Sequence, residues 1–404
     1  MASWGMTAPK TFSDRSPASL NGQATAALRA GDWRGAARWF EEATKLDPAS
    51  TALQRNLASA YRAGGDDAGE QRALQAALDL DRRDLIAWVR LAELHERRGV
   101  SGEALASWHA ALALSAGAQA LPPALVQALA HGRAYAEAAA AHIRTAAEEA
   151  LGPVVGGADE TAARRVRAMV DHALGNRPLY INQCAGLRYP FLPAYEFFDR
   201  RHFSWFEALE ARTDAIRGEL HRLLADPGNA LRPYVRMDKG VGDNPWSGLD
   251  GSLDWGACFL WEYGEPNQAV LDRCPATAAA LAAIPAASIP GRSPSAFFSL
   301  LKPGARIPPH TGVTNTRAIV HLALDVPAGC GFRVGGETRS WEEGRAFAFD
   351  DTIEHEAWND GQMMRAVLIL DTWNPHLSQT ERDAIVNYYA AADATGYGPA
   401  KGSG

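Results

Sequence analysis

Apolar positions recur with a fixed period in the first part of the chain. Gly31, Gly65 and Gly99 lie 34 residues apart. Three further columns of apolar residues keep this spacing: Phe40, Leu74 and Trp108; Ala43, Ala77 and Ala111; Leu46, Leu80 and Leu114. A glycine in the first turn and a small residue where two helices cross predict one helix–turn–helix unit in each period.

Such a unit cannot bury its apolar face alone, so neighbouring units must stack into a solenoid. The 34-residue period is that of tetratricopeptide repeats, and three units are about the minimum for a stable array. The alternative is an ordinary helical bundle with coincidental spacing. We predict a tetratricopeptide-like domain with capping helices over residues 21–150, whose groove binds an extended peptide or another domain.

The segments around this array are polar or helical. Helical spacing of apolar residues continues to about residue 176. We expect residues 1–20 to form a disordered leader, 151–176 a helical linker and 395–404 a flexible tail.

From residue 177 onward the apolar pattern changes to short β-rich segments separated by turns. The expected strands are 232–237, 257–264, 296–301, 317–326, 331–336, 345–350 and 365–373. Helices are expected over 203–225, over 274–285 and after a Ser378–Glu381 capping box. Strands at this spacing indicate a sandwich or barrel. We therefore predict an α+β multidomain chain with a jelly-roll or cupin-like barrel and flanking helices over 177–394.

Composition excludes several classes of function. The net charge of −7 over 404 residues argues against nucleic acid as a partner. No run of 18 apolar residues exists, and the first 20 residues lack an apolar signal core, so we expect neither a membrane span nor secretion. The four cysteines are scattered without a CxxC pair, which favours reduced thiols and a cytoplasmic location.

Candidate chemistry gathers between residues 299 and 373. His310 follows a Pro-Pro step, His355 lies in an acidic stretch, and Arg365 begins the apolar run of the last strand. Imidazole is a suitable ligand for iron, zinc or copper, and a buried guanidinium binds a carboxylate through two hydrogen bonds. Two histidines and an arginine inside a barrel predict a metal site with an anion clamp. The alternative for Arg365 is an ion pair with Asp350 or Glu354.

One ligand of the usual non-haem iron pattern is missing. In that pattern a carboxylate stands two residues after the first histidine, and here that position is Gly312. Three explanations remain open: water completes the metal sphere, a halide fills the gap, or Asp350 or Asp351 reaches in from elsewhere.

The runs PPHTGVTNTRAIVHLALDVP and WEEGRAFAFDDTIEHEAWNDGQMMRAVLILDTWNP closely resemble the catalytic core of the aspartyl/asparaginyl β-hydroxylase family. The resemblance covers roughly residues 180–375. It implies an Fe(II)- and 2-oxoglutarate-dependent oxygenase on a double-stranded β-helix. Tetratricopeptide-type repeats ahead of the oxygenase domain also occur in this family.

The family uses two histidines without a carboxylate ligand, so the resemblance makes Gly312 expected. It implies that His310 and His355 hold iron. By the same resemblance, Arg365 and the hydroxyl of Ser299 bind the distal carboxylate of 2-oxoglutarate, and His321 contacts the carboxylate nearer the iron.

The chain departs from the family at one position. The family pattern places two basic residues around a single position, whereas this chain has Arg317 but Ile319. We expect Arg317 among the cofactor-binding residues. The loss at Ile319 affects the expected substrate more than the cofactor. The Trp-rich loop over 246–255 is expected to form a lid or a substrate rim.

The resemblance predicts hydroxylation of the β-carbon of an aspartyl or asparaginyl residue in a peptide or protein, with 2-oxoglutarate converted to succinate and CO2. Two other functions remain: a repeat scaffold with a non-catalytic barrel, and a hydroxylase or halogenase of a small molecule. Retention of both histidines with Arg365 argues against the scaffold. The repeat array favours a polymeric substrate over a small molecule.

Overall fold

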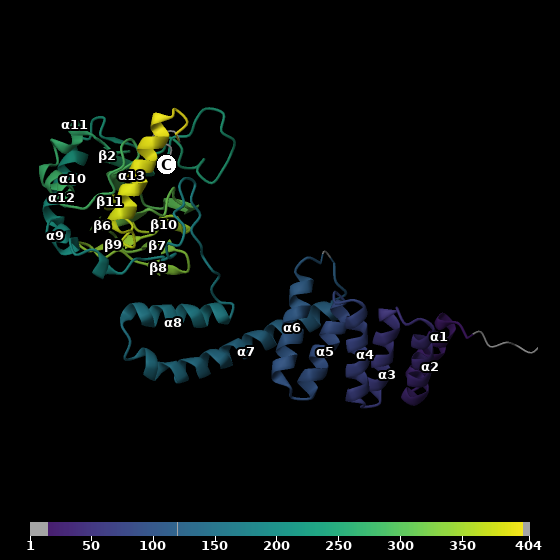
Figure 1. Cartoon of the computed structure of the whole chain (residues 1–404). Coiled ribbons are helices and arrows are strands. Elements are labelled where there is room, and N and C mark those ends of the chain that lie inside the picture. The colour runs from purple at the N-terminus through teal and green to yellow at the C-terminus, as the bar shows by residue number, and fades with distance from the viewer. Residues whose placement is uncertain (1–14, 119, 399–404) are drawn as a thin grey trace, which may run out of the picture. The chain divides into compact units, whose positions relative to one another are not determined.

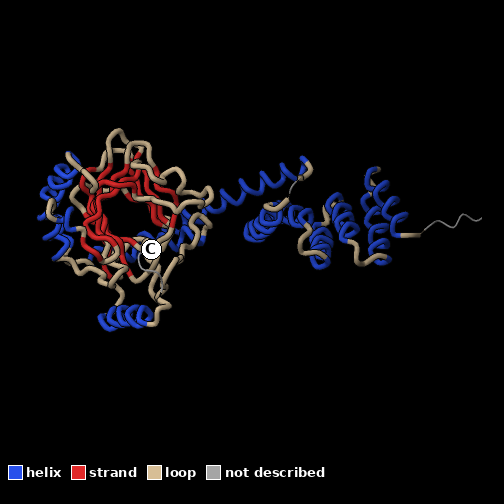
Figure 2. The backbone as a smooth tube through the Cα atoms, turned by 90° about the horizontal axis from the view of Figure 1, so that it is seen from above, coloured by secondary structure: helices blue, strands red, loops and turns tan. Residues whose placement is uncertain are grey.

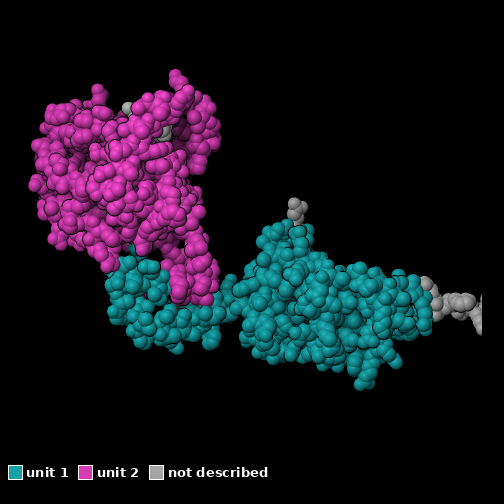
Figure 3. Space-filling model, viewed as in Figure 1, with its two compact units in different colours: residues 1–166 teal, residues 167–404 magenta. Residues whose placement is uncertain are grey.

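The structure is a computed structural model that describes residues 15–118 and 120–398. The chain divides into two compact units, residues 1–166 and 167–404 (Figure 3). Residues 1–14 of the leader expected over 1–20 and residues 399–404 of the expected tail lie outside the described residues.

The N-terminal unit consists of helices (Figure 1). Their bounds are α1 Pro17–Arg29, α2 Trp33–Leu46, α3 Thr51–Ala63, α4 Asp67–Leu80, α5 Leu85–Arg97, α6 Ser101–Ser115, α7 Pro123–Val155 and α8 Glu160–Ala173, which crosses into the second unit. Helices α1 to α6 pack as three successive pairs, α1 with α2, α3 with α4 and α5 with α6, and each pair contacts the next. The predicted tetratricopeptide-like array is confirmed.

The three periodic glycines join the helices of each pair. Gly31, Gly65 and Gly99 have φ values of 81°, 70° and 69°, a left-handed conformation that side chains with a Cβ rarely adopt. The tight turn therefore explains why the same residue recurs every 34 positions.

Two of the three periodic columns of apolar residues are buried, whereas residues of the third are partly exposed. The column of Phe40, Leu74 and Trp108 is buried, as is the alanine column of Ala43, Ala77 and Ala111. Leu46 and Leu80 are instead 54% and 45% exposed, because each ends its helix at the edge of the array.

The helical unit also differs from the expected boundaries. Helix α1 already begins at Pro17, because the Ser16 side chain accepts a hydrogen bond from the Ser19 backbone and caps it. Helix α7 runs unbroken through residue 150, where the repeat domain was expected to end, and contains Pro153 near its C-terminus.

The C-terminal unit is built on two antiparallel sheets. The seven-stranded sheet has the order β1-β2-β4-β11-β6-β9 with β3 beside β2, and the four-stranded sheet has the order β5-β10-β7-β8. The strand bounds are β1 Leu231–Pro233, β2 Trp255–Glu262, β3 Glu265–Pro266, β4 Ala296–Leu301, β5 Arg306–His310, β6 Arg317–Asp325, β7 Cys330–Val334, β8 Glu337–Arg339, β9 Ala346–Phe349, β10 His355–Asn359 and β11 Arg365–Trp373.

The large sheet has two different faces. Along the central strand β11, Ala366, Leu368 and Leu370 point outward into a core shared with the helices over 206–282, namely α9 Phe206–Glu210, α10 Thr213–Ala225, α11 Gln268–Leu271 and α12 Pro275–Ala282. The alternate positions face the small sheet. Figure 2 shows the strands of this unit with helices outside them. The last helix, α13 Gln379–Ala394, packs Ile385 and Tyr389 against Ile289 and begins at the predicted capping box.

The expected closed barrel is not formed by strand pairing, because no ladder joins the two sheets among the described strands. Both sheets keep free edges. The edge strand β5 contains Pro308 and Pro309, which cannot donate backbone hydrogen bonds and are tolerated only at such an edge.

Two other expected elements are shorter than predicted. The strand expected over 232–237 is confined to β1. The single helix expected over 203–225 is divided into α9 and α10 around residues 211–212.

Candidate functional site

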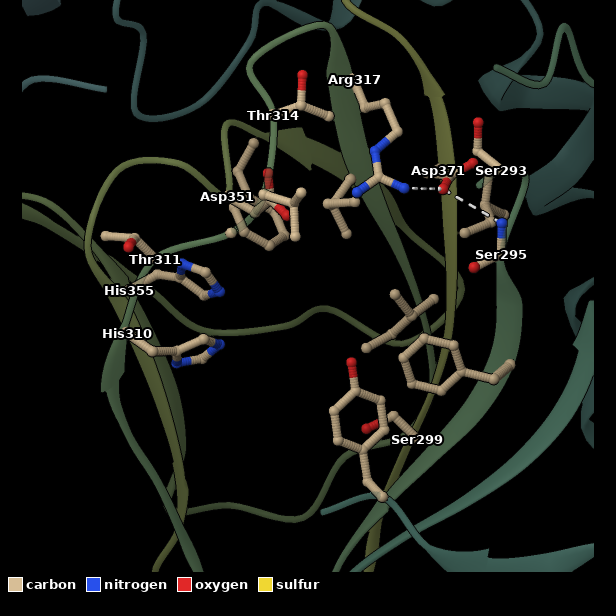
Figure 4. Close-up of a pocket in the computed structure, with 18 of the residues that line it drawn as sticks. Ser293, Ser295, Ser299, His310, Thr311, Thr314, Arg317, Asp351, His355 and Asp371 are labelled. Atoms are coloured by element: carbon tan, nitrogen blue, oxygen red, sulfur yellow. Dashed lines mark hydrogen bonds and ion pairs between the residues drawn. The ribbon is translucent and has the colours of Figure 1, made fainter. Parts of the chain in front are cut away.

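A cavity of about 850 Å³ lies on the inner faces of the two sheets. Its walls carry side chains from β4, β6 and β11 of the large sheet and from β5 and β10 of the small sheet. All six residues that the sequence singled out line it: Ser299, His310, Arg317, His321, His355 and Arg365 (Figure 4, which labels four of them).

The two histidines face each other across neighbouring strands. His310 ends β5, His355 begins β10, and the two are direct partners in the antiparallel register. Their ring centroids are 4.0 Å apart. Figure 4 shows both rings pointing into the cavity from the same side.

Both imidazoles have the tautomer that a metal ligand needs. Nδ1 of His310 lies 2.8 Å from the carbonyl oxygen of Pro308, and Nδ1 of His355 lies 3.0 Å from that of Ile353. A carbonyl oxygen only accepts, so each Nδ1 is the donor, and each Nε2 keeps its lone pair free. These backbone contacts also fix the orientation of the rings.

Burial keeps both rings neutral. It lowers the pKa of His310, and it lowers the pKa of His355 well below the usual 6.5, with His310 adding to the effect. Trp246 packs edge-on against His310 with a centroid distance of 4.9 Å, so the Trp-rich loop does form part of the rim. Neutral imidazole is the form that binds a metal.

Arg365 is a buried cation without a counter-ion. It is 1% exposed, and its Nε and Nη2 atoms have no hydrogen-bond partner. Its guanidinium lies over the ring of Trp341 at 5.1 Å, and burial lowers its pKa to about 10. The alternative ion pair is not formed: Asp350 binds Asn182 and Thr352, and Glu354 binds Arg333.

Ser299 and His321 come from the two strands that flank β11, and both are buried on the same face as Arg365. The hydroxyl oxygen of Ser299 accepts from Trp255 Nε1 at 3.0 Å, which leaves its proton free to donate. Nδ1 of His321 accepts from Trp341 Nε1 at 3.3 Å. Burial and then Arg365 lower the pKa of His321 well below 6.5, so its Nε2–H is a neutral donor. This end of the cavity therefore presents donors to an anion.

The space beside Gly312 is filled by Asp351. A Cβ at residue 312 would lie 2.1 Å from the Asp351 Oδ2 atom, so only glycine fits there. Of the two aspartates considered for this gap, Asp351 is therefore the one that reaches it. Burial raises its pKa to about 6, against the opposing effect of Arg317.

Arg317 lies at the other end of the cavity from Arg365. Its Nη1 donates to Asp371 Oδ2 at 3.0 Å (Figure 4). Ile319, the position of the family departure, is the direct register partner of Asp371. The structure thus places Arg317 in an ion pair with Asp371, and its expected place among the cofactor-binding residues stays a prediction. The sequence pattern did not single out Asp371.

A segment far away in the sequence holds the loops that carry the histidines. Asn182 Nδ2 donates to Asp350 Oδ2 at 2.7 Å and to Thr352 Oγ1 at 2.9 Å. The backbone N–H of Gln183 donates to Thr352, and that of Gly186 donates to Val313. We call residues 182–186 the strap. The sequence pattern did not single out these contacts.

With this geometry in place, residues 210–375 match the family model described as aspartyl/asparaginyl beta-hydroxylase. Residues 210–375 are therefore similar in sequence to the aspartyl/asparaginyl β-hydroxylase family. The chain is 38% identical over 133 residues to the aspartyl/asparaginyl beta-hydroxylase of Mus musculus, a match that covers 33% of this chain and 18% of that protein. The chain thus spans less than a fifth of this relative's length.

A second relative is covered more fully. The ornithine lipid ester-linked acyl 2-hydroxylase of Rhizobium tropici is 31% identical over 192 residues, which cover 47% of this chain and 64% of that protein. Both proteins are named for hydroxylation, but the names give different substrates.

Solved structures match the helical unit. The Arabidopsis OM64 TPR domain is 21% identical, with 30% of this chain and 96% of that chain covered and a TM-score of 0.26. The Sgt2 TPR domain from Aspergillus fumigatus is 18% identical, with 31% and 85% covered and a TM-score of 0.27.

Two searches of the described residues found nothing. Every helix there is too short or too polar to cross a bilayer. Likewise, no group of three or more His, Cys, Asp or Glu side chains in the described part of the chain is arranged to hold a metal ion.

Proposed function

We propose that the C-terminal unit is an Fe(II)- and 2-oxoglutarate-dependent hydroxylase. The observation that carries this proposal is Arg365, a fully buried guanidinium with two unpartnered nitrogen atoms in the same cavity as two neutral histidines. A protein keeps such a cation unpaired only where a ligand supplies the anion. A dicarboxylate that also chelates a metal fits both features.

The residues present are consistent with this cofactor pair. His310 and His355 would hold the metal through Nε2, and their carbonyl partners keep the proton on Nδ1. Two ligands leave most of the metal sphere open, as an oxygen-activating iron requires. When bound, iron with 2-oxoglutarate and dioxygen supplies the chemistry that inserts one oxygen atom into a C–H bond and releases succinate and CO2.

The side chains around the clamp position the cosubstrate and keep the site dry. Arg365 would form two charge-assisted hydrogen bonds to the distal carboxylate, with Ser299 donating a third and His321 donating to the carboxylate nearer the metal. The aromatic rings of Trp246, Trp255 and Trp341 exclude water from this region.

The proposal extends to fold and substrate. We take the two facing sheets as the two halves of a double-stranded β-helix, with the metal histidines on the smaller half. The target is an aspartyl or asparaginyl β-carbon in a peptide, and the helical repeats provide a groove for the rest of that peptide. Support comes from the family and from the 34-residue array.

The experiment is an anaerobic Fe(II) titration with 2-oxoglutarate, monitored by the visible metal-to-ligand charge-transfer band. Wild type should give the band, His355→Ala should lose it, and Arg365→Met should require more 2-oxoglutarate. A folded, iron-loaded wild-type protein without the band would contradict the proposal and favour the non-catalytic scaffold. A product mass increase of one oxygen atom, rather than a halogen isotope pattern, would separate hydroxylation from halogenation.

A further inference from the structure

The cavity has two chemically different ends, and one strand reaches both. Arg365 and Asp371 are both on β11, and both face inward. Six residues of extended strand separate their Cα atoms by about 20 Å. The Arg365 end presents donors, as described above. The Asp371 end carries two carboxylates, Asp371 and Asp351, beside one guanidinium, Arg317.

Four side chains at the Asp371 end have buried polar atoms without a partner: Ser293, Asp371, Asp351 and, at Nε, Arg317. Asp371 is 3% exposed, and its Oδ2 accepts from Arg317 Nη1 at 3.0 Å and from the Ser295 backbone at 3.2 Å, while its Oδ1 has no partner. Ser293 is 2% exposed, and its hydroxyl has no partner. Both line the cavity, and Figure 4 shows them beside Arg317.

The charges at this end do not cancel. One guanidinium, Arg317, interacts with two carboxylates, Asp371 and Asp351, and Oδ1 of Asp351 also has no partner. Burial opposes the charge on Arg317, but the carboxylates outweigh it and raise its pKa. Burial raises the pKa of Asp371 to about 6, against the effect of Arg317, so this carboxylate is ionised at pH 7.5.

Nearby charged groups on the cavity wall do not offset this excess. Arg292 forms a bidentate ion pair with Asp393, and Glu262 pairs with Arg232. The wall next to Asp371 is apolar, since its register partner is Ile319, and Ile369 and Phe297 also line the cavity. The end of the cavity is therefore an anionic, acceptor-rich recess reached over apolar side chains.

We propose that this recess binds a nitrogen donor of the substrate, a primary ammonium in preference to an amide, and rejects a carboxylate. The inference rests on the proposed function, because it assigns a second group that the hydroxylase recognises in its peptide substrate, apart from the reacting aspartyl or asparaginyl residue. An ammonium donates to Asp371 Oδ1, Asp351 Oδ1 and Ser293 and balances the second carboxylate. Its alkyl stem lies along Ile319. A carboxylate would meet two like charges, Asp371 and Asp351, opposed by the single guanidinium of Arg317, whose Nη1 already donates to Asp371.

The test uses three probes of equal length, n-butylammonium, butyramide and butyrate, with binding measured by isothermal titration calorimetry at pH 7.5. All proteins carry Arg365→Met, so that butyrate reports on the Arg317 end alone and neither metal nor cosubstrate is needed. We expect n-butylammonium to bind at least about tenfold more tightly than butyrate, with butyramide between them.

Neutralising one carboxylate should reverse this order. In Asp371→Asn, Arg317 loses its partner, so butyrate affinity should rise and n-butylammonium affinity should fall about tenfold. Ile319→Lys places a cation opposite Asp371 and should have the same effect if Asp371→Asn does not fold. Asp360→Asn is the matched control, since it neutralises an exposed carboxylate paired with Arg306 outside the cavity.

Equal binding of the three probes, or an unchanged order in both cavity variants, would overturn the inference. A fall of equal size in Asp360→Asn would assign the binding to surface charge and overturn it too. The outcome is independent of the hydroxylase proposal, which the charge-transfer titration of the Arg365-containing protein tests separately.

Discussion

The two units treat their buried polar groups in opposite ways. In the helical unit, buried Asp84 accepts two hydrogen bonds from Arg55 and one from the Ala87 backbone, and buried Glu70 pairs with Arg97. In the sheet unit, several buried polar atoms have no hydrogen-bond partner. All buried side-chain atoms without a partner in the described part of the chain lie there, on Ser293, Arg317, Asp351, Arg365, Asp371, His376 and Arg382.

Five of those seven residues line one cavity: Ser293, Arg317, Asp351, Arg365 and Asp371. An unsatisfied buried polar group costs about 1–3 kcal/mol, so a fold retains a cluster of them only where something else compensates. The comparison teaches that buried polar side chains do not by themselves indicate a functional site. A cluster of buried polar side chains without hydrogen-bond partners, all lining the same cavity, does indicate one.

Two buried histidines give the sharpest form of this comparison. His95 and His355 are both 7% exposed, but His95 lies in the helical unit, where its Nδ1 contacts the Ser107 hydroxyl at 3.3 Å, whereas His355 lines the cavity beside His310. His355→Ala should lower Fe(II) affinity more than about 100-fold and abolish turnover, because loss of even an outer-shell partner costs about 10–100-fold. His95→Ala should leave iron binding unchanged and cost about 1–3 kcal/mol of stability. Calorimetric Fe(II) titration and urea unfolding measure both; similar losses of iron from the two variants would remove the distinction.

Replacing an arginine by methionine should have opposite effects on stability in the two units. Arg365→Met should raise the half-saturating 2-oxoglutarate concentration at least about 100-fold, since two charge-assisted hydrogen bonds of about 1.5–3 kcal/mol each are lost. It should also leave the free energy of unfolding unchanged or higher, because an unpaired buried cation is removed.

Arg55→Met is the matched control. It leaves Asp84 buried and unpaired, so it should cost up to about 3–5 kcal/mol without affecting 2-oxoglutarate. Urea unfolding followed by far-UV circular dichroism gives the sign. A large loss of stability in Arg365→Met would mean that Arg365 is structural.

In the strap, the same hydrogen bonds should contribute both to stability and to the position of the site. Asn182→Ala removes one of the donors to the buried carboxylate of Asp350 and should cost about 1–3 kcal/mol. We expect weaker Fe(II) binding as well, because the strap holds the loop that leads to His355. Gln183→Ala is the control: its side chain is exposed, and its bond to Thr352 is from the backbone. If both variants behave like wild type, the strap does not position the site.

The smallest effects are expected in the helical turns. Gly65→Ala forces a Cβ into a left-handed backbone with φ of 70° and should cost about 1–2 kcal/mol, although no atom lies within 4 Å of that Cβ. Gly102→Ala, inside α6 with equally open space, should instead stabilise by about 0.4–1 kcal/mol. Thermal unfolding compares the two. Equal shifts of the melting temperature in the two variants would show that the left-handed backbone is not the reason why glycine recurs every 34 residues.

The sequence predicted the two units to different depths. The 34-residue period was sufficient to predict the helical array, because contacting residues there lie within about one repeat of each other in the sequence. Strand β11 was predicted to the residue, since its apolar run is buried on both faces. Strand β5 was missed because two prolines obscure it, and they are tolerated only at a sheet edge that the sequence does not reveal.

Parts of the candidate site were beyond sequence reasoning for the same reason. The histidines and Arg365 were recognisable from their motif. That Asp351 occupies the space beside Gly312 depends on a contact across 39 positions, and the bond from Asn182 to Asp350 spans 168. Only the folded chain shows that Nη1 of Arg317 donates to Asp371.

Strand β11 has one further consequence. It is hydrogen-bonded on both sides, to β4 and β6, so the separation between Arg365 and Asp371 is a fixed length. Inserting one residue between them would turn one of the two onto the outer face, and inserting two would shift it by nearly 7 Å. Mutations that preserve function can therefore change the length of ligand that the cavity accepts only by changing the side chains that line it. This frame should tolerate changes in which group is recognised far better than changes in how far that group lies from Arg365.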